Sequence, residues 1–276
     1  MKDLLDYWEK HWISWQKTPQ KFNNYLQDLN KSLLGTKVPD EKLAFVDYAP
    51  LHLVGNWTKT EGKLFIGSLN PGAAEHKEFH RWESDKRGYD WVESRRQNIT
   101  WEQQAEFCLN FFRNMSTLSF KHPFYIKVGK VINGVYSPVS KDWRQICIQL
   151  QKKLVSGELI PFYSKDFQLH RNADPFTLEE FWNRMKMFLI NSHFNTFLLN
   201  GKGAYERFLK NKEIEHAKDE KPVTVQLPHG RSKVEIIRIK DFYGVLSPHI
   251  GRINSDDGLG LISSQLKRAM KRNGYL

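Results

Sequence analysis

The chain has 276 residues, of which 40% are hydrophobic, 13% aromatic and 26% charged, with a formal net charge of +11 at pH 7. This apolar content is enough for one large core, and no stretch approaches the roughly 18 uninterrupted apolar residues that a membrane span needs. The acidic residues near the first methionine do not fit a secretory signal peptide, so we expect a cytoplasmic protein with no membrane partner. Two isolated cysteines and scattered histidines show no metal-ligand spacing, so we expect neither a metal nor another cofactor.

The excess positive charge indicates the class of partner. Such an excess attracts polyanions over about one Debye length, roughly 8–10 Å at physiological salt. A basic protein that is also rich in aromatic residues is typical of proteins that bind nucleic acid.

We predict a single domain, in which residues 1–60 form a helical extension and residues 63–276 form the core. Trp8, Trp12 and Trp15 stand at the i, i+4 and i+7 positions of the extension, which places three indole rings on one helix face. A helix docked on the core is favoured over a helix that stacks these rings on DNA.

The core begins with a predicted strand over residues 63–69, which ends in the turn signal Asn70-Pro71-Gly72. Residues 76–136 have little clean periodicity apart from a helix across 101–114. We interpret this segment as an elaboration that covers or flanks the site.

From residue 140 onward the pattern becomes regular. We predict helices at 140–155, 177–190, 204–210 and 259–272, and strands at 158–160, 195–199, 223–227, 234–239 and 242–246. Strands that alternate with helices predict an α/β fold with a mostly parallel central sheet flanked by helices. Ligands of such sheets bind beyond the carboxyl ends of the strands, so we expect the loops at Asn70, Phe162, Asn200 and His249 to converge on one crevice.

Two of these loops resemble motifs of a known family. Residues 67–72 (GSLNPG) look like the first motif of the uracil-DNA glycosylase superfamily, in its G-x-N-P-G form, and residues 247–254 (SPHIGRIN) resemble the second. Residues 198–204 (LLNGKGA) are similar to a strand-to-helix turn of the same fold. The resemblance covers about residues 63–72 and 140–272, and it implies an enzyme that removes a base from an extruded nucleotide of DNA.

The chemistry of base removal fits the two residues that the motifs contain. Breaking an N-glycosidic bond builds positive charge on the sugar and negative charge on the departing base. The resemblance implies that Asn70 positions the attacking water, and an amide suits placement better than proton abstraction. His249 can donate a hydrogen bond to O2 of the base as charge grows there. Asn70 in an Asx turn and His249 as a surface histidine are the alternatives, and their joint placement favours catalysis.

Further residues are candidates for contacts with the base and with DNA. For the base they are Gly72, Ala73, Glu158, Phe162 and Asn200. For the rest of the DNA they are Ser68, Ser247, Ile250, Gly251, Arg252, Ile253, Lys267, Arg268 and Lys271.

The base-binding candidates favour a bulky cytosine. Gly72 and Ala73 leave room where other members of the family place a ring that excludes 5-substituted pyrimidines. The carboxylate of Glu158 can accept from the N4 amine of cytosine, and Phe162 can stack on the base. Glu158 at the exposed start of a strand is an equally good interpretation. The pattern is similar to phage-defence glycosylases that remove glucosylated 5-hydroxymethylcytosine.

The DNA-binding candidates divide into a wedge and a phosphate-binding helix. Ile250, Arg252 and Ile253 are candidates for a side chain that fills the space left by the extruded nucleotide. The cations on the last helix are candidates for phosphate contacts, with a solvated helix end as an equally good alternative.

Three functions remain open from the sequence. The first is a monomeric, monofunctional DNA glycosylase that hydrolyses the bond to a bulky modified cytosine and leaves an abasic site. The second is a uracil or mismatch glycosylase of base-excision repair, and the third is a catalytically inactive basic DNA-binding protein.

Overall fold

The computed structural model describes residues 2–34, 51–69, 99–117, 121–136, 142–160, 174–208 and 214–276. Within these ranges, eight strands form a mixed sheet in the order β1-β3-β2-β4-β8-β7-β5, with β6 paired to β7. The strands are β1 (Leu53–Val54), β2 (Leu64–Ser68), β3 (Leu154–Glu158), β4 (Thr196–Asn200), β5 (Glu215–His216), β6 (Val223–Leu227), β7 (Gly230–Ile239) and β8 (Phe242–Ser247). The helices are α1 (Lys2–Lys17), α2 (Pro19–Leu34), α6 (Trp101–Leu109), α7 (Phe111–Met115), α8 (Pro123–Tyr136), α9 (Trp143–Lys153), α10 (Pro175–Ile190), α11 (Lys202–Phe208) and α12 (Asp256–Arg272).

The predicted α/β class is confirmed, but the prediction of a mostly parallel sheet is wrong. The neighbouring strands β3, β2, β4 and β8 are parallel, whereas β1, β5, β6 and β7 all pair antiparallel. Only two residues separate β6 from β7, and only two separate β7 from β8. A connection this short can only reverse the chain, because a parallel crossover needs a dozen residues or more.

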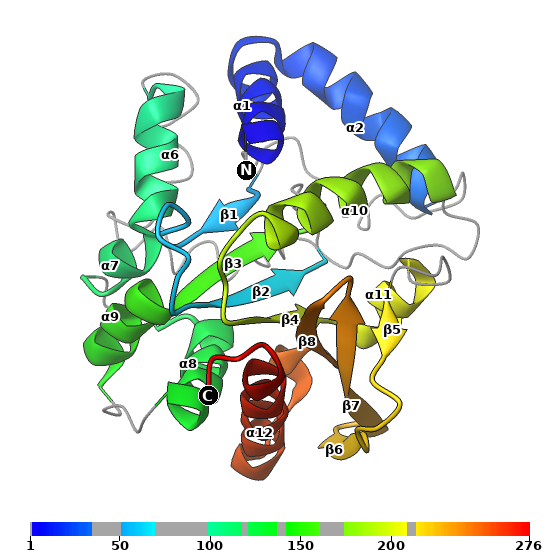
Figure 1. Ribbon diagram of the computed structural model, residues 1–276. Coiled ribbons are helices and arrows are strands. Elements are labelled where there is room, and N and C mark those ends of the chain that lie inside the picture. The colour runs from blue at the N-terminus through cyan, green and yellow to red at the C-terminus, as the bar shows by residue number, and fades with distance from the viewer. Residues whose placement is uncertain are drawn as a thin grey trace.

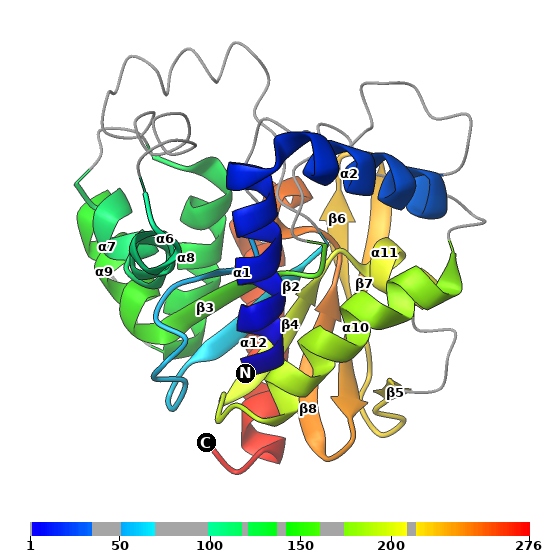
Figure 2. The same ribbon diagram turned by 90° about the horizontal axis from the view of Figure 1, so that it is seen from above.

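Helices cover both faces of the sheet (Figure 1). One core contains α1, α2 and α10 with the face of the sheet that presents Phe65 and Phe197. The other contains α7, α8, α9 and α12 with the face that presents Ile66 and Leu198. Viewed from above, α1 and α10 lie across the strands beneath them (Figure 2).

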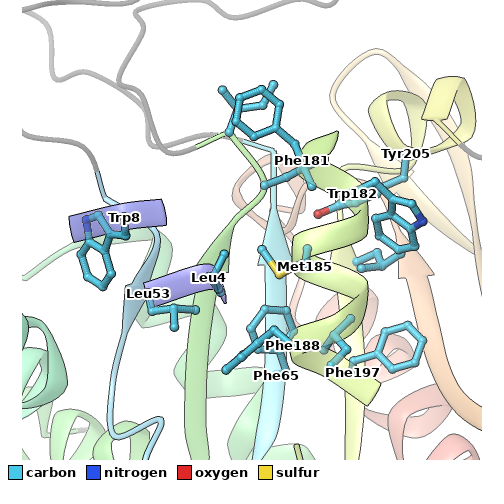
Figure 3. Packing of buried hydrophobic residues seen from close by; sticks show 14 of the residues in the cluster. Leu4, Trp8, Leu53, Phe65, Phe181, Trp182, Met185, Phe188, Phe197 and Tyr205 are labelled. Carbon is cyan, nitrogen blue, oxygen red and sulfur yellow. The ribbon is translucent and has the colours of Figure 1, made fainter. Parts of the chain in front are cut away.

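The N-terminal helices are docked on the core, as the spacing of their tryptophans predicted. Trp8, Trp12 and Trp15 are 0%, 1% and 1% exposed. The same apolar layer continues through α10 to β2, where the rings of Phe188 and Phe65 lie 5.7 Å apart (Figure 3). These indoles are therefore structural, and they are not available to stack on DNA.

Two element boundaries differ from the prediction in ways that affect the site. Strand β3 begins at Leu154, so Glu158 ends the strand instead of starting it. Helix α10 begins at Pro175 and is capped by Asp174, whose carboxylate accepts hydrogen bonds from the backbone N–H of Phe176 and Thr177 at 3.3 and 3.0 Å. The helix therefore begins two residues before the predicted start at 177, because the carboxylate of Asp174 satisfies the first amides.

Replacing Trp12 with alanine should lower the free energy of unfolding by about 3–5 kcal/mol, the usual cost of truncating a buried tryptophan. The exposed neighbour Lys10 provides the control, because Lys10→Ala should change stability little. Urea denaturation measures both variants. A Trp12→Ala protein with wild-type stability and lost DNA affinity would contradict the assignment of Trp12 to the core.

Candidate functional site

The ends of the four parallel strands form one row across the sheet. Ser68 pairs in register with Glu158 on one side and with Asn200 on the other. Asn200 in turn pairs with Ser247. The strand ends that precede the four expected loops thus lie side by side at the carboxyl edge, and they bring together residues from four distant parts of the chain.

The four side chains of this row share one face of the sheet. Side chains alternate between faces along a strand, so each row residue points the same way as the residue two positions before it. Ile66, Leu198 and Val245 precede Ser68, Asn200 and Ser247, respectively, and all three belong to the core beneath α8 and α12. The row is therefore the polar end of that core.

Asn200 connects the two loops that resemble the family motifs. Its amide Nδ2 donates to Ser68 Oγ at 3.0 Å, and its Oδ1 accepts from the backbone N–H of Ile250 at 2.7 Å. Gly201 follows with a φ of +118°, and its N–H donates to the carbonyl of Ser247 at 2.9 Å. Because Asn200 is fully buried and uses its amide within the protein, we assign it a positioning role instead of the expected contact with the base.

The loop after β8 fixes the protonation of His249. The backbone N–H of Gly251 donates to His249 Nδ1 at 3.2 Å, so a neutral ring has its proton on Nε2. A Cβ at position 251 would lie 2.9 Å from the imidazole ring, so any other residue there would push the ring out of this position.

His249 as a residue is exposed, but neighbouring protein excludes water from part of its ring, and this desolvation is the main reason that its pKa is lowered to about 4. The positive charges of Arg252 and Lys127 contribute to the lower pKa. At neutral pH the ring is therefore uncharged, and its Nε2–H is a hydrogen-bond donor.

Helix α8 supports this loop, and sequence reasoning missed it. Lys127 Nζ donates to the carbonyl of Gly251 at 2.7 Å and to Asn254 Oδ1 at 3.2 Å. The ring of Phe124 lies 5.5 Å from that of His249, tilted by 31°. A signal was present, since Val128, Val131, Ile132 and Val135 follow the i, i+3, i+4, i+7 spacing of a helix and are buried. The expected elaboration therefore flanks the site through α8.

Glu158, at the far end of the row from Ser247, is partly exposed. Its Oε2 is nevertheless buried and, among the residues that the structure describes, has no hydrogen-bond partner. Desolvation raises the pKa of its carboxyl group to about 8. Tyr125 of α8 and Tyr205 of α11 lie close enough to experience its charge, which raises their pKa values further after the larger effect of burial.

Two of the three wedge candidates are wrong. Ile250 and Ile253 are both 0% exposed, because the short 3-10 turn at Ile250–Arg252 directs these side chains into the core of α8 and α12. Neither can enter DNA. Arg252 is exposed and stays a candidate for the wedge or for a phosphate contact.

The serines of the row are also inaccessible. Ser68 and Ser247 are 5% and 0% exposed, and Ser247 Oγ donates to the carbonyl of Pro248 at 2.9 Å. Both serines were expected to contact DNA, but their hydroxyl groups lie within the protein.

The basic cluster on α12 lies at the wrong end of the sheet for this site. Asn273, directly after the helix, bonds to the backbone N–H of Tyr243 at 2.8 Å, so α12 ends where β8 begins. Asp256 and Lys271 are separated by about 22 Å along a helix that rises 1.5 Å per residue.

The cations of this helix end also have acidic neighbours from elsewhere in the chain. Arg268 pairs with Glu220, and Arg272 pairs with Asp219 and Glu220, from the segment between β5 and β6. Lys267, Arg268 and Lys271, the predicted phosphate contacts, therefore lie toward the edge of the sheet opposite the His249 loop, because a helix that follows a parallel strand returns to that edge; their contact with DNA stays a prediction.

Several expected site residues lie outside the described ranges. They are Asn70, Gly72, Ala73 and Phe162. Asn70 follows Ser68 by two residues in the sequence, and Phe162 follows Glu158 by four.

The chain matches no profile of a known protein family, and a search of curated proteins finds no significant match. None of the helices in the described ranges is both long and apolar enough to cross a membrane.

The position of Arg252 and of the α12 cations gives a paired prediction for DNA affinity. Arg252→Ala should weaken binding and, if it removes one phosphate contact, reduce the log–log salt slope by about 0.9. Lys271→Ala should change both quantities little, because Lys271 lies at the opposite edge of the sheet. Fluorescence anisotropy over a salt series measures both; equal losses in the two variants would contradict a binding face at the carboxyl edge.

Proposed function

We propose that this chain is a monofunctional DNA glycosylase, which hydrolyses the N-glycosidic bond of an extruded nucleotide and leaves an abasic site. The main support is the connection through Asn200, which joins the end of β2, just before Asn70, to the loop that presents His249. We further propose that the four parallel strands form a uracil-DNA glycosylase-like core, with the antiparallel strands added at its edges.

In the proposed reaction, the bond between C1′ of the sugar and the base nitrogen breaks, and the base keeps the electron pair. Water supplies hydroxide to C1′ and a proton to the base. Asn70 holds this water, and His249 donates its Nε2–H to O2 of the departing base. A neutral imidazole can fill this role because its Nε2–H donates a hydrogen bond that strengthens as negative charge grows on O2.

We propose a bulky modified cytosine, such as glucosylated 5-hydroxymethylcytosine of phage DNA, as the base. The small residues Gly72 and Ala73 support this choice, because they leave room for a substituent on C5. Glu158, whose Oε2 has no hydrogen-bond partner among the described residues, supports a pyrimidine in general. A uracil or mismatch glycosylase is the second candidate.

We propose that the partner is DNA, bound by a cytoplasmic monomer. The net charge of +11 supports this partner. A DNA-binding protein without catalysis is the remaining alternative.

An abasic-site assay separates these candidates. Duplexes containing glucosylated 5-hydroxymethylcytosine, uracil or only ordinary bases are incubated with the protein and then cleaved with alkali. Cleavage at the modified cytosine supports the proposal, and cleavage at uracil alone supports the repair enzyme. Binding of all three duplexes without any cleavage would leave only the DNA-binding protein.

Asn70→Ala should nearly abolish base removal without weakening DNA binding, because it removes the group that places water and no phosphate contact. Single-turnover cleavage and anisotropy measure the two properties. Wild-type turnover in this variant would exclude the role assigned to Asn70.

His249→Ala should slow base removal by about 100- to 10,000-fold, the range for loss of one key donor or proton-transfer group. His229, an exposed histidine in the turn between β6 and β7, provides the matched control, because His229→Ala should cleave at the wild-type rate. If both variants cleave equally well, His249 is not the donor.

A further inference from the structure

We infer that Glu158 reads the extruded base as an uncharged carboxylic acid, donating one hydrogen bond to the edge of the ring and accepting another from it. This inference rests on the proposed function. It names the chemical form in which the base-reading side chain acts, and it differs from the expectation that a carboxylate only accepts.

The position of Glu158 follows from the register of the sheet. It ends β3 beside Ser68, in the same row as Asn200 and Ser247 and on the same face. Helix α8 spans both ends of the site: Phe124 contacts His249, and the adjacent Tyr125 lies near Glu158. Glu158 and His249 thus stand at opposite sides of one row, with the first turn of α8 bridging them.

The surroundings of Glu158 disfavour a negative charge. In the described part of the chain its buried Oε2 accepts no hydrogen bond, and no cation offsets the cost of removing a carboxylate from water. A carboxyl group in this position avoids that cost by retaining its proton. The raised pKa of Glu158, about 8, agrees with this geometry.

In the described part of the chain, Tyr125, Tyr205 and His52 lie near Glu158, and burial favours the uncharged form of each. Tyr125 packs from α8 and Tyr205 from α11, and burial raises the pKa of both hydroxyl groups. His52, just before β1, lies with Nδ1 3.2 Å from the backbone carbonyl of Glu158, and burial lowers its pKa to about 3. The buried Cys108 lies near enough to Tyr125 to affect its pKa. Burial raises the pKa of Glu158 itself to about 8, just above neutral pH.

An uncharged carboxyl group matches the edge of a pyrimidine. Its O–H can donate to N3 of cytosine while its C=O accepts from the N4 amine. A carboxylate could accept from N4 but would also face the lone pair of N3. Uracil fits the same group with the proton on the other oxygen, so selection between the two pyrimidines falls to the space around C5. Substituents on C5 leave this paired edge unchanged.

The pH dependence of cleavage tests this inference. Base removal by the wild-type protein should fall as pH rises through about 8 and be about tenfold lower at pH 9, because only the protonated form of Glu158 donates. Glu158→Gln should cleave well and show no such fall, since an amide offers one donor and one acceptor in the same shape and does not ionise. Glu158→Ala should be slow at every pH. The measurement is single-turnover cleavage of a duplex with glucosylated 5-hydroxymethylcytosine, or with uracil if only that base is removed.

A measurement on the free protein keeps the two proposals separate. The infrared difference spectrum of the wild-type protein minus the Glu158→Gln variant at pH 7 should contain the C=O band of a protonated carboxyl group. This band should vanish above pH 9. If abasic sites form but Glu158→Gln retains the alkaline fall, or the band is absent at pH 7, the inference about Glu158 fails and the glycosylase stands. If no duplex is cleaved by the wild-type protein, the proposed function fails, and the base-reading role fails with it.

Discussion

The site depends on one buried amide. Asn200 connects the end of β2 to the loop after β8 through two hydrogen bonds, and these segments are separated by well over a hundred residues in the sequence. Such a connection is possible because both strands end at the same level as β4, so that one short side chain reaches both neighbours. A buried amide that satisfies its partners in this way fixes a geometry more than it adds stability.

The residues at the strand ends are therefore of two kinds. Some hold the loops in position, and others are proposed to face a substrate. Ser68, Asn200 and Ser247 are buried and bond within the protein, although the motifs drew attention to them first. His249 in the loop and Glu158 at the end of β3 are, with Asn70, the groups to which the proposed function assigns chemistry. The N–H of Gly251 leaves the proton of a neutral His249 ring on Nε2, and burial without a hydrogen-bond partner among the described residues favours the protonated form of Glu158.

The sequence predicted the strand ends better than it predicted side-chain exposure. Strand β2 and the strands that end at Asn200 and Ser247 were predicted from short apolar runs that stop at glycine or proline. Glu158 was assigned to the start of a strand, because apolar periodicity alone does not distinguish the end of α9 from the beginning of β3. Periodicity could have revealed α8, but its contact with His249 joins residues more than a hundred positions apart. The position of the basic end of α12 could not be predicted, because charge in a sequence does not show which edge of a sheet a returning helix reaches.

The protonation of His249 in the free protein is the most direct test of whether the folded loop presents a donor before DNA arrives. Nitrogen-15 NMR of the labelled protein can report which ring nitrogen bears the proton. We predict a neutral ring with hydrogen on Nε2 and none on Nδ1 at pH 7, persisting until the pH approaches 4. A charged ring at pH 6, or a proton on Nδ1, would contradict a loop built to present this donor.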